Sequence, residues 1–294
     1  MGRALADQFR EARLVFEEAD DALGESLSTL IFNGPAETLT LTENTQPAIL
    51  TVSTAAYRVL SSRGLEPSVV AGHSLGEYSA HVAAGTFGFA DAVRVVRHRG
   101  RYMQEAVPVG IGAMAAILGL DAASVEQACA DAAMGEVVGA ANLNAPGQVV
   151  IAGAAAAVGR AIERAKAMGA RRAIPLQVSA PFHCALMKPA EERLAPQLRA
   201  LTVTTPRVPV VANVDAQPKA DGASAIDALI TQVSAPVRWD DVMQRLLQDG
   251  ATSFVEVGPG TVLTGLARKA SRESKSAHID APEHLASVEA VFRS

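Results

Sequence analysis

The sequence predicts an α/β fold in which a larger domain carries a smaller inserted subdomain. Over most of the chain, apolar runs of strand length alternate with amphipathic stretches of helical length. This alternation is typical of a mainly parallel sheet whose strands are connected by helices. The middle of the chain differs, because strand, helix, strand, helix and strand patterns follow one another closely. One additional strand there would complete the βαββαβ order of a ferredoxin-like unit.

Composition excludes several classes of protein. The chain has 294 residues, 49% hydrophobic and 19% charged, so it can bury a large core or form two unequal domains. A net charge of −5 gives no indication of a nucleic-acid partner. No apolar run approaches the ~20 residues of a membrane span, and the charged N-terminus does not resemble a signal peptide. The two cysteines form no C-x-x-C pair, so we expect a cytoplasmic protein without disulfides.

The larger domain is predicted to comprise residues 1–109 and 180–294. Its N-terminal stretch "MGRALADQFREARLVFEEAD" predicts an amphipathic helix. The other elements predicted in this domain are helices at 45–64 and 91–107 and strands at 68–72, 208–214 and 253–258.

The inserted subdomain is predicted to span residues 110–179. Its expected elements, in order, are a strand at 112–120, a helix at 121–133, strands at 137–144 and 147–153, a helix at 155–169 and a strand at 171–178. The insert would meet the larger domain in a cleft, and clefts of this kind commonly bind ligands.

A reactive serine is predicted at Ser74, in the G-x-S-x-G stretch "GHSLG". The pattern is short enough to arise by chance. Here, however, it follows a predicted strand and precedes a predicted helix, which is the context of a nucleophile elbow. The two glycines would keep Cβ atoms out of the sharp turn. Leu75 opens the helix, so its N–H is free to stabilise an oxyanion.

The base that such a serine requires is predicted to be His183, in "QVSAPFHCALMKPA". This residue follows the last strand of the insert, at the point where the chain re-enters the larger domain, and should face the cleft. A purely structural imidazole is the alternative. The other histidines fit the role less well: His73, His81, His98, His278 and His284.

Arg99 is the most informative charged residue. Around the predicted helix at 91–107, it falls in the middle of the apolar side, whereas Arg94, Arg97 and Arg101 lie opposite. A buried guanidinium is costly unless an anion compensates its charge. That anion is either an internal carboxylate in a structural ion pair or the carboxylate of a substrate.

Other site patterns are absent. The stretch "VGPGTVLTG" has Gly258 and Gly260 but Leu263 at the position where a dinucleotide fingerprint requires its third glycine. No Walker A sequence occurs. The His and Cys spacings match no zinc site. We therefore expect neither a metal ion nor a cofactor.

Six stretches together resemble one family: "AGHSLGEYSA", "RHRGRYMQEAVPVGIGAMAAILGL", "NLNAPGQVVIAG", "VSAPFHCALMKP", "PVRWDDVM" and "EVGPGTVLTGLARK". They are similar, in the same order, to the malonyl-CoA:acyl carrier protein transacylases of bacterial type II fatty acid synthesis. The acyltransferase domains of polyketide synthases are related. The resemblance implies an α/β-hydrolase-like domain with a ferredoxin-like insert, malonyl-CoA and acyl carrier protein as partners, no cofactor, and a monomer.

The resemblance also implies roles for individual residues. Ser74 would carry the malonyl group as an ester, and His183 would act as general base and then acid. Arg99 would hold the malonyl carboxylate, and the main-chain carbonyl of Gln232 would orient the histidine, which makes a Ser–His dyad. Two further residues match family positions near the substrate, Phe182 in its malonyl-selecting form and, more weakly, Asn144.

One departure from the family concerns the N-terminus. Family members begin with a strand and a G-Q-G-S-Q loop that supplies a second oxyanion N–H, whereas "MGRALADQF" resembles the family's sequence beyond that loop. With the Leu75 amide as the only assured donor, we expect this exact form to be an impaired enzyme, since one lost donor costs ~10²–10³ in rate.

Three alternatives stay open. The first is a discrete polyketide synthase acyltransferase with the same chemistry. The second is a serine esterase or thioesterase, whose usual residue order would enlist His278 or His284. The third is a catalytically silent module that binds the carrier protein. Two groups of basic residues could meet an acidic carrier protein or be merely solvated: Arg94, Arg97 and Arg101, and Lys166, Arg171 and Arg172.

Overall fold

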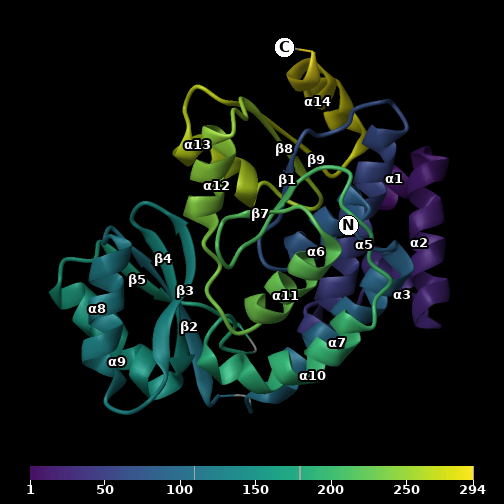
Figure 1. Ribbon diagram of the computed structural model, residues 1–294. Coiled ribbons are helices and arrows are strands. Elements are labelled where there is room, and N and C mark those ends of the chain that lie inside the picture. The colour runs from purple at the N-terminus through teal and green to yellow at the C-terminus, as the bar shows by residue number, and fades with distance from the viewer. Residues whose placement is uncertain (109, 179, 294) are drawn as a thin grey trace.

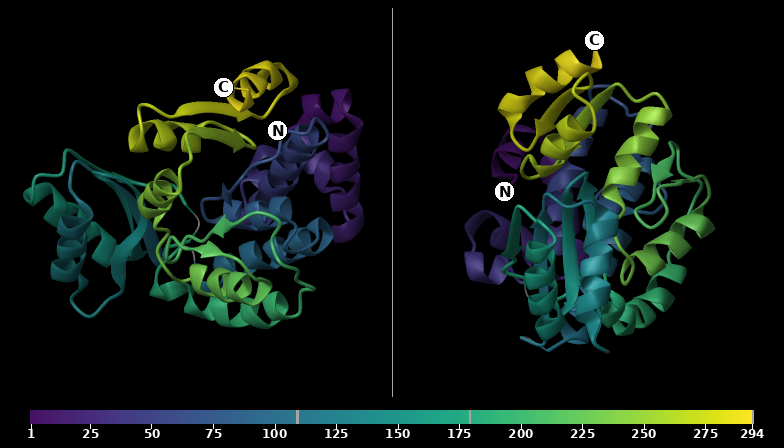
Figure 2. Two further views of the ribbon diagram at one scale, coloured as in Figure 1. Left: turned by 45° about the horizontal axis from the view of Figure 1, so that its top comes forward. Right: turned by 90° about the vertical axis from the view of Figure 1, so that its left-hand side faces the viewer.

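The computed structural model describes residues 1–108, 110–178 and 180–293. It has a larger helical lobe with small sheets and a smaller lobe at one side, which lies at the left of Figure 1. The smaller lobe and the N-terminal helices occupy opposite ends of the molecule in the left view of Figure 2. The predicted boundaries of the insert fall on residues 109 and 179, which lie outside the described residues. In the described part of the chain, no helix is long and apolar enough to cross a bilayer.

The larger lobe contains most of the helices. Its elements are α1 (Arg3–Gln8), α2 (Arg10–Leu23), α3 (Leu27–Asn33), α4 (Ala36–Leu39), α5 (Thr42–Ser61), β1 (Val70–Ala71), α6 (Leu75–Ala84), α7 (Phe89–Ala106), the 3-10 helix η1 (Ala185–Met187), α10 (Lys188–Arg199), β6 (Val210–Val211), β7 (Pro218–Lys219), α11 (Gly222–Gln232), α12 (Trp239–Gln248), β8 (Ser253–Val257), α13 (Val262–Ala270), β9 (Lys275–Ile279), the 3-10 helix η2 (Pro282–His284) and α14 (Leu285–Phe292).

The N-terminal segment forms two helices, α1 and α2, where the sequence predicts one. Phe9 separates them with an extended backbone, φ −120° and ψ 125°. Its N–H closes α1 on the carbonyl of Leu5, and its own carbonyl accepts the N–H of Arg13 in α2. The change of direction lets the chain bury the Phe9 ring, which also lies under the guanidinium of Arg63.

The sheet of the larger lobe is smaller than predicted. Parallel pairing is present between β1 and β6 and between β8 and β9, but these pairs belong to two separate sheets, and β7 joins β6 antiparallel. The predicted strand at 208–214 is cut short to two residues because Asn213 leaves the ladder. Its backbone N–H instead donates to the carboxylate of Glu77, at 3.0 Å. The prediction of a single mainly parallel sheet was therefore wrong in this detail.

The smaller lobe has the order β2 (Gly112–Leu118), α8 (Ala122–Ala133), β3 (Val138–Ala145), β4 (Gln148–Ala154), α9 (Ala155–Ala167) and β5 (Arg172–Pro175). The strands lie side by side as β3-β4-β2-β5, and all neighbours are antiparallel. This order and these directions are those of a ferredoxin-like unit. Asp121 begins α8 by accepting the N–H of Ser124 in its side chain, as an N-cap does.

Each lobe has its own apolar core. The larger core lies among α1, α2, α5, α7, α10 and α11, and a separate core lies between the four-stranded sheet and α8 and α9. The lobes are joined by main-chain hydrogen bonds, because Val237 exchanges bonds of 2.9 Å with Leu143 and Ala141 of β3. Val237 lies between α11 and α12, so this pairing holds the segment that connects these two helices against β3 of the smaller lobe.

Gly100 allows α7 to cross the start of α5 closely. A Cβ at this position would lie 2.5 Å from the carbonyl oxygen of Thr42 and 2.7 Å from the Cα of Glu43. We expect Gly100→Ala to lower the free energy of unfolding by ~1–3 kcal/mol through overpacking. Gly159, exposed in α9 with open space around it, is the control, and Gly159→Ala should raise it by up to ~1 kcal/mol. Urea denaturation measures both, and equal effects would contradict the close crossing.

Candidate active site

Ser74 lies on a sharp turn between β1 and α6. Its backbone has φ 52° and ψ −109°, a conformation that costs a non-glycine residue energy. The strand approaches the helix very closely there, since a Cβ on Gly72 would lie 2.0 Å from the carbonyl group of Gly76. Gly76 itself faces open space. The expectation that both glycines are needed for room therefore holds for Gly72 and not for Gly76.

Ser74, His183 and Gln232 form a continuous chain of hydrogen bonds. The Oγ of Ser74 lies 2.7 Å from Nε2 of His183, and Nδ1 of His183 lies 3.0 Å from the main-chain oxygen of Gln232. A carbonyl oxygen only accepts, so Nδ1 carries the proton and Nε2 presents its lone pair to the serine hydroxyl. Burial, and next the charge of Arg99, lower the pKa of His183 to about 3, which keeps this base neutral.

Arg99 lies beside the serine with its charge unpaired. The side chain is only 2% exposed. One terminal nitrogen donates to Oε1 of Gln46 at 2.6 Å, and the other donates to Oε1 of Gln232 at 2.9 Å and to the Oγ of Ser74 at 3.2 Å. Within the described residues, no carboxylate is within ion-pair distance, and the buried Nε–H has no acceptor. A structural ion pair, one of the two explanations for this arginine, is therefore excluded for the described part of the chain.

Glu77 lies beneath the turn and was not identified from the sequence. It is fully buried, and its Oε2 accepts the backbone N–H of Asn213 at 3.0 Å and the amide of Gln232 at 2.8 Å. Asn213 in turn accepts the N–H of Ser74 at 2.7 Å and donates to the carbonyl of Gly72 at 2.8 Å. Burial raises the pKa of Glu77 to about 7. These contacts hold the strained turn in place.

The residues missed by sequence reasoning had signals of different strength. Glu77 stands three positions after Ser74 on the buried face of α6 and shares that face with His81 one turn further on, so its signal in the sequence is weaker than that of Arg99. Gln46 and Asn213 are neutral, so their burial leaves no comparable signature in charge patterning. Their importance depends on which acceptor meets which donor, and this is visible only in the folded chain.

The other predicted site residues lie around this centre. Leu75 is the first residue of α6, so its N–H has no partner within the helix and lies next to the reactive hydroxyl. Asn144 contacts His73 rather than Ser74, with its Oδ1 2.9 Å from the imidazole Nε2. Phe182 is half-buried and packs against the core of the larger lobe and against a second apolar cluster, which lies on the face of the four-stranded sheet opposite α8 and α9.

The remaining histidines do not reach Ser74. His81 is fully buried, with Nδ1 3.0 Å from the hydroxyl of Thr86. His98 is exposed on α7 and contacts Gln197. His278 and His284 lie together at β9 and η2, with ring centres 4.2 Å apart. The base available to Ser74 is His183, whose Nδ1 is held by the main-chain oxygen of Gln232 and not by the Asp or Glu of a standard serine hydrolase.

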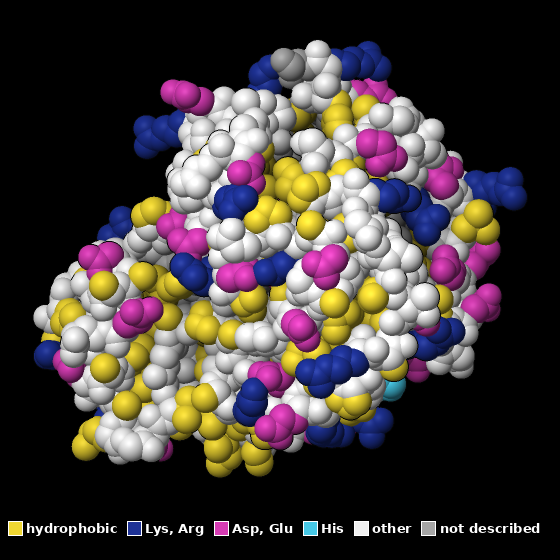
Figure 3. All heavy atoms as spheres, in the orientation of Figure 1, with side chains coloured by type: hydrophobic (Ala, Val, Ile, Leu, Met, Phe, Trp, Pro, Cys, Tyr) yellow, Lys and Arg dark blue, Asp and Glu magenta, His cyan; other side chains and the backbone are white. Residues whose placement is uncertain are grey.

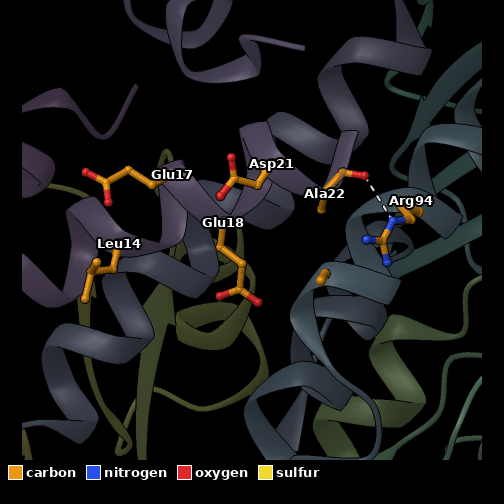
Figure 4. A pocket seen from close by; sticks show the side chains of 7 residues that line it. Leu14, Glu17, Glu18, Asp21, Ala22 and Arg94 are labelled. Carbon is orange, nitrogen blue, oxygen red and sulfur yellow. Dashed lines mark hydrogen bonds between the residues drawn. The ribbon is translucent and has the colours of Figure 1, made fainter. Parts of the chain in front are cut away.

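A surface hollow between α2 and α7 is a separate feature (Figure 4). It is lined by Leu14, Glu17, Glu18, Asp21, Ala22, Ala90 and Arg94. Arg94 donates to the main-chain oxygen of Ala22 at 3.0 Å. The hollow contains none of the predicted site residues and is not part of the site around Ser74.

Replacing the two glycines of the turn should affect stability to very different extents. Gly72→Ala would force a Cβ into the backbone of α6, so we expect the free energy of unfolding to fall by about 3 kcal/mol, the upper end for overpacking. Gly76→Ala is the matched control and should leave it within ~1 kcal/mol of the original value. Chemical denaturation compares them, and a tolerated Gly72→Ala would mean that the strand does not approach the helix in this way.

Comparison with known proteins places these features in one family. A model of the acyl transferase domain matches residues 1–286. The malonyl CoA-acyl carrier protein transacylase of Bacillus subtilis is 49% identical over 286 residues, which are 97% of this chain and 90% of the relative. The crystal structure of an acyl carrier protein S-malonyltransferase from Vibrio cholerae superimposes with a TM-score of 0.96 at 47% identity, covering 98% of this chain and 94% of that one. A type II PKS acyl-carrier protein in complex with its malonyl-transacylase gives a TM-score of 0.96 at 44% identity, covering 100% and 95%. The chain belongs to the acyl transferase family, among the malonyl CoA-acyl carrier protein transacylases.

Proposed function

We propose that this chain transfers a malonyl group from malonyl-CoA to the phosphopantetheine thiol of an acyl carrier protein, through an ester on Ser74. One observation carries the proposal: a buried guanidinium, for which the described part of the chain supplies no carboxylate at ion-pair distance, lies 3.2 Å from a hydroxyl that is hydrogen-bonded to a neutral imidazole. The first group selects a carboxylate, and the other two perform acyl transfer. The names of the closely similar relatives support the same reaction.

In the first half of the reaction, the Oγ of Ser74 attacks the thioester carbonyl of malonyl-CoA. Its proton passes to Nε2 of His183, and the Leu75 N–H stabilises the oxyanion. The C–S bond then breaks, and the imidazolium returns its proton to the departing CoA thiolate. The main-chain oxygen of Gln232 holds the Nδ1–H throughout.

In the second half, the thiol of the carrier protein replaces CoA. His183 takes the thiol proton, the sulfur attacks the seryl ester, and the proton returns to Oγ of Ser74 as the ester bond breaks. The reaction needs no cofactor, because His183 serves as the base in both half-reactions and Ser74 is the nucleophile of the first and the leaving group of the second. All the residues invoked come from one chain, which is consistent with a monomer.

Arg99 gives the proposed reaction its selectivity. Among the residues that the structure describes, its Nε–H has no acceptor, and one terminal nitrogen already faces Ser74. The two N–H groups on that edge of the guanidinium can therefore bind a carboxylate in bidentate fashion. A malonyl ester on Ser74 would place its free carboxylate near this edge of the guanidinium, because Arg99 lies 3.2 Å from the Oγ of Ser74. Phe182 and Asn144 would line the same space, as the family resemblance implies.

The basic residues on the surface differ in how far their charge is already compensated. Arg94, Arg97, Arg101 and Lys166 each form an ion pair. Arg171 directly precedes the edge strand β5 and Arg172 begins it, and neither forms an ion pair within the described residues. Charges of both signs are interspersed over the face seen in Figure 3. Of the two groups of basic residues, the one at β5 is thus the better candidate to meet an acidic carrier protein, in either fatty acid or polyketide synthesis.

Arg99→Ala should separate malonyl from acetyl transfer. Removing a buried charge-assisted contact costs roughly 3 kcal/mol, so we expect malonylation of Ser74 to slow about 100-fold. Acetylation should change far less, because acetyl-CoA has no carboxylate. Intact mass after timed incubation with each thioester measures both rates, and Arg101→Ala, an exposed arginine of the same helix, is the control.

Equal losses with both thioesters would contradict the carboxylate role of Arg99. Absence of any adduct on the unmodified chain would favour a silent binding module. An adduct that water removes as quickly as a carrier-protein thiol would favour a thioesterase. Ser74→Ala must abolish the adduct in every case.

The pH dependence of acylation should report His183. Because its pKa is lowered to about 3, kcat/KM should hold from pH 8 down to 5, where a base with the ordinary pKa of about 6.5 would already be protonated. In Arg99→Ala, measured with acetyl-CoA, the fall should move to higher pH, since one cause of the lowered pKa is removed. Glu77→Gln is the control, because the pKa of Glu77 is raised to about 7. A fall near pH 7 that disappears in this variant would assign the titration to Glu77 instead.

A further inference from the structure

Three potential metal ligands, His278, Asp280 and His284, lie at and after the end of β9 and belong to no site described above. Residues alternate between the two faces of a strand, so Ala277 and Ile279 face the core while His278 and Asp280 face outward together. The 3-10 helix η2 then turns the chain back and presents His284 to the same place. The sequence H-x-D-x-x-x-H thus becomes one cluster through local geometry alone.

The positions of the ligating atoms favour a common third partner. One ligand atom from each side chain lies within 4.8 Å of the other two. Nδ1 of His284 is 2.9 Å from Oδ1 of Asp280, yet this buried nitrogen has no hydrogen-bond partner, so the short contact fails on direction rather than on distance. The two atoms are thus close neighbours that do not form a hydrogen bond with each other. Two ligands ~2.0–2.1 Å from one ion are separated by roughly 2.9–3.3 Å, depending on the angle between them.

The neighbouring polar residues that the structure describes do not occupy the ligand atoms of the two histidines. Glu256, the neighbour of His278 across β8 and β9, uses its carboxylate to accept the N–H groups of Leu263 and Thr264 at the start of α13. The backbone N–H of Gly260 donates to Oδ2 of Asp280 at 3.4 Å, while Oδ1 is the oxygen next to His284. Such support orients a ligand toward its ion.

We propose that His278, Asp280 and His284 bind a divalent transition-metal ion, with Zn²⁺ as the ion of choice and water completing the coordination. Two imidazoles and one carboxylate suit zinc and do not suit Ca²⁺ or Mg²⁺, which prefer oxygen ligands. The ion would fasten β9 to η2 and α14, at the top of Figure 1. The expectation of no metal site came from spacings that pair cysteines and histidines, and this cluster contains no cysteine.

Titration of the chelator-stripped full chain with ZnCl₂ tests the site. We expect about one ion bound per chain by calorimetry and a rise in Tm of several degrees, because an ion that binds only the folded state stabilises it. Asp280→Asn and His284→Ala should each weaken binding at least tenfold. His98→Ala, which removes an exposed histidine on α7, is the matched control and should bind as the original chain does.

Absence of binding by the original chain at millimolar Zn²⁺ would overturn the site. So would equal binding by His284→Ala, or equal weakening by His98→Ala, since either result would indicate adventitious ions. If a variant fails to fold, the visible spectrum of the Co²⁺-loaded original chain decides instead: coordination by imidazoles in a four- or five-coordinate site gives d–d bands that are stronger and lie at longer wavelength than those of hexaaquo-cobalt, and the spectrum of hexaaquo-cobalt alone would contradict the assignment. Acylation of Ser74 provides the folding control, because the proposed site takes no part in it.

Discussion

A positive charge buried beside a nucleophile, with no carboxylate of the described residues at ion-pair distance, is the constraint on which the rest of this structure depends. Burial of a guanidinium without an anion is costly, and here amide oxygens of Gln46 and Gln232, with the hydroxyl of Ser74, solvate it instead. These acceptors are neutral, so they stabilise Arg99 without cancelling its charge. The same charge contributes, after burial, to the lowered pKa of His183. It also acts to lower the pKa of Glu77, but burial outweighs it there and the pKa is raised. One residue therefore influences selectivity, the state of the base and the support of the turn.

Gln232 connects these effects. Its main-chain oxygen holds His183, its side-chain oxygen holds Arg99, and its amide nitrogen donates to Glu77 and to the carbonyl of Ser74. The amide can satisfy all these partners in one orientation only, since oxygen must face the guanidinium and nitrogen the carboxylate. His183, like Ser74, has a positive φ, of 59°. Two strained backbones are thus fixed by one network, as is common at functional sites.

Much of this could be predicted from the sequence, because it depends on local patterns. The α/β class and the family are confirmed, and the predicted elements of the insert coincide with β2, α8, β3, β4, α9 and β5. The structure also brings Ser74, His183, Arg99 and Gln232 together, while their chemical roles remain predictions. The break at Phe9 and the early end of β6 at Asn213 were not foreseeable, because each depends on a tertiary contact that overrides local propensity. Neutral partners such as Gln46 escaped for the same reason.

The main-chain bonds between Val237 and β3 have a mechanical consequence. Val237 follows Gln232 by five residues, and between them the chain has only a short irregular segment. A swing of the smaller lobe about its two connections would pull on that segment and carry the carbonyl away from the imidazole. Separation of the two lobes would therefore disturb the catalytic base. A thioester too bulky to enter without separating the lobes would impair acyl transfer by its own entry.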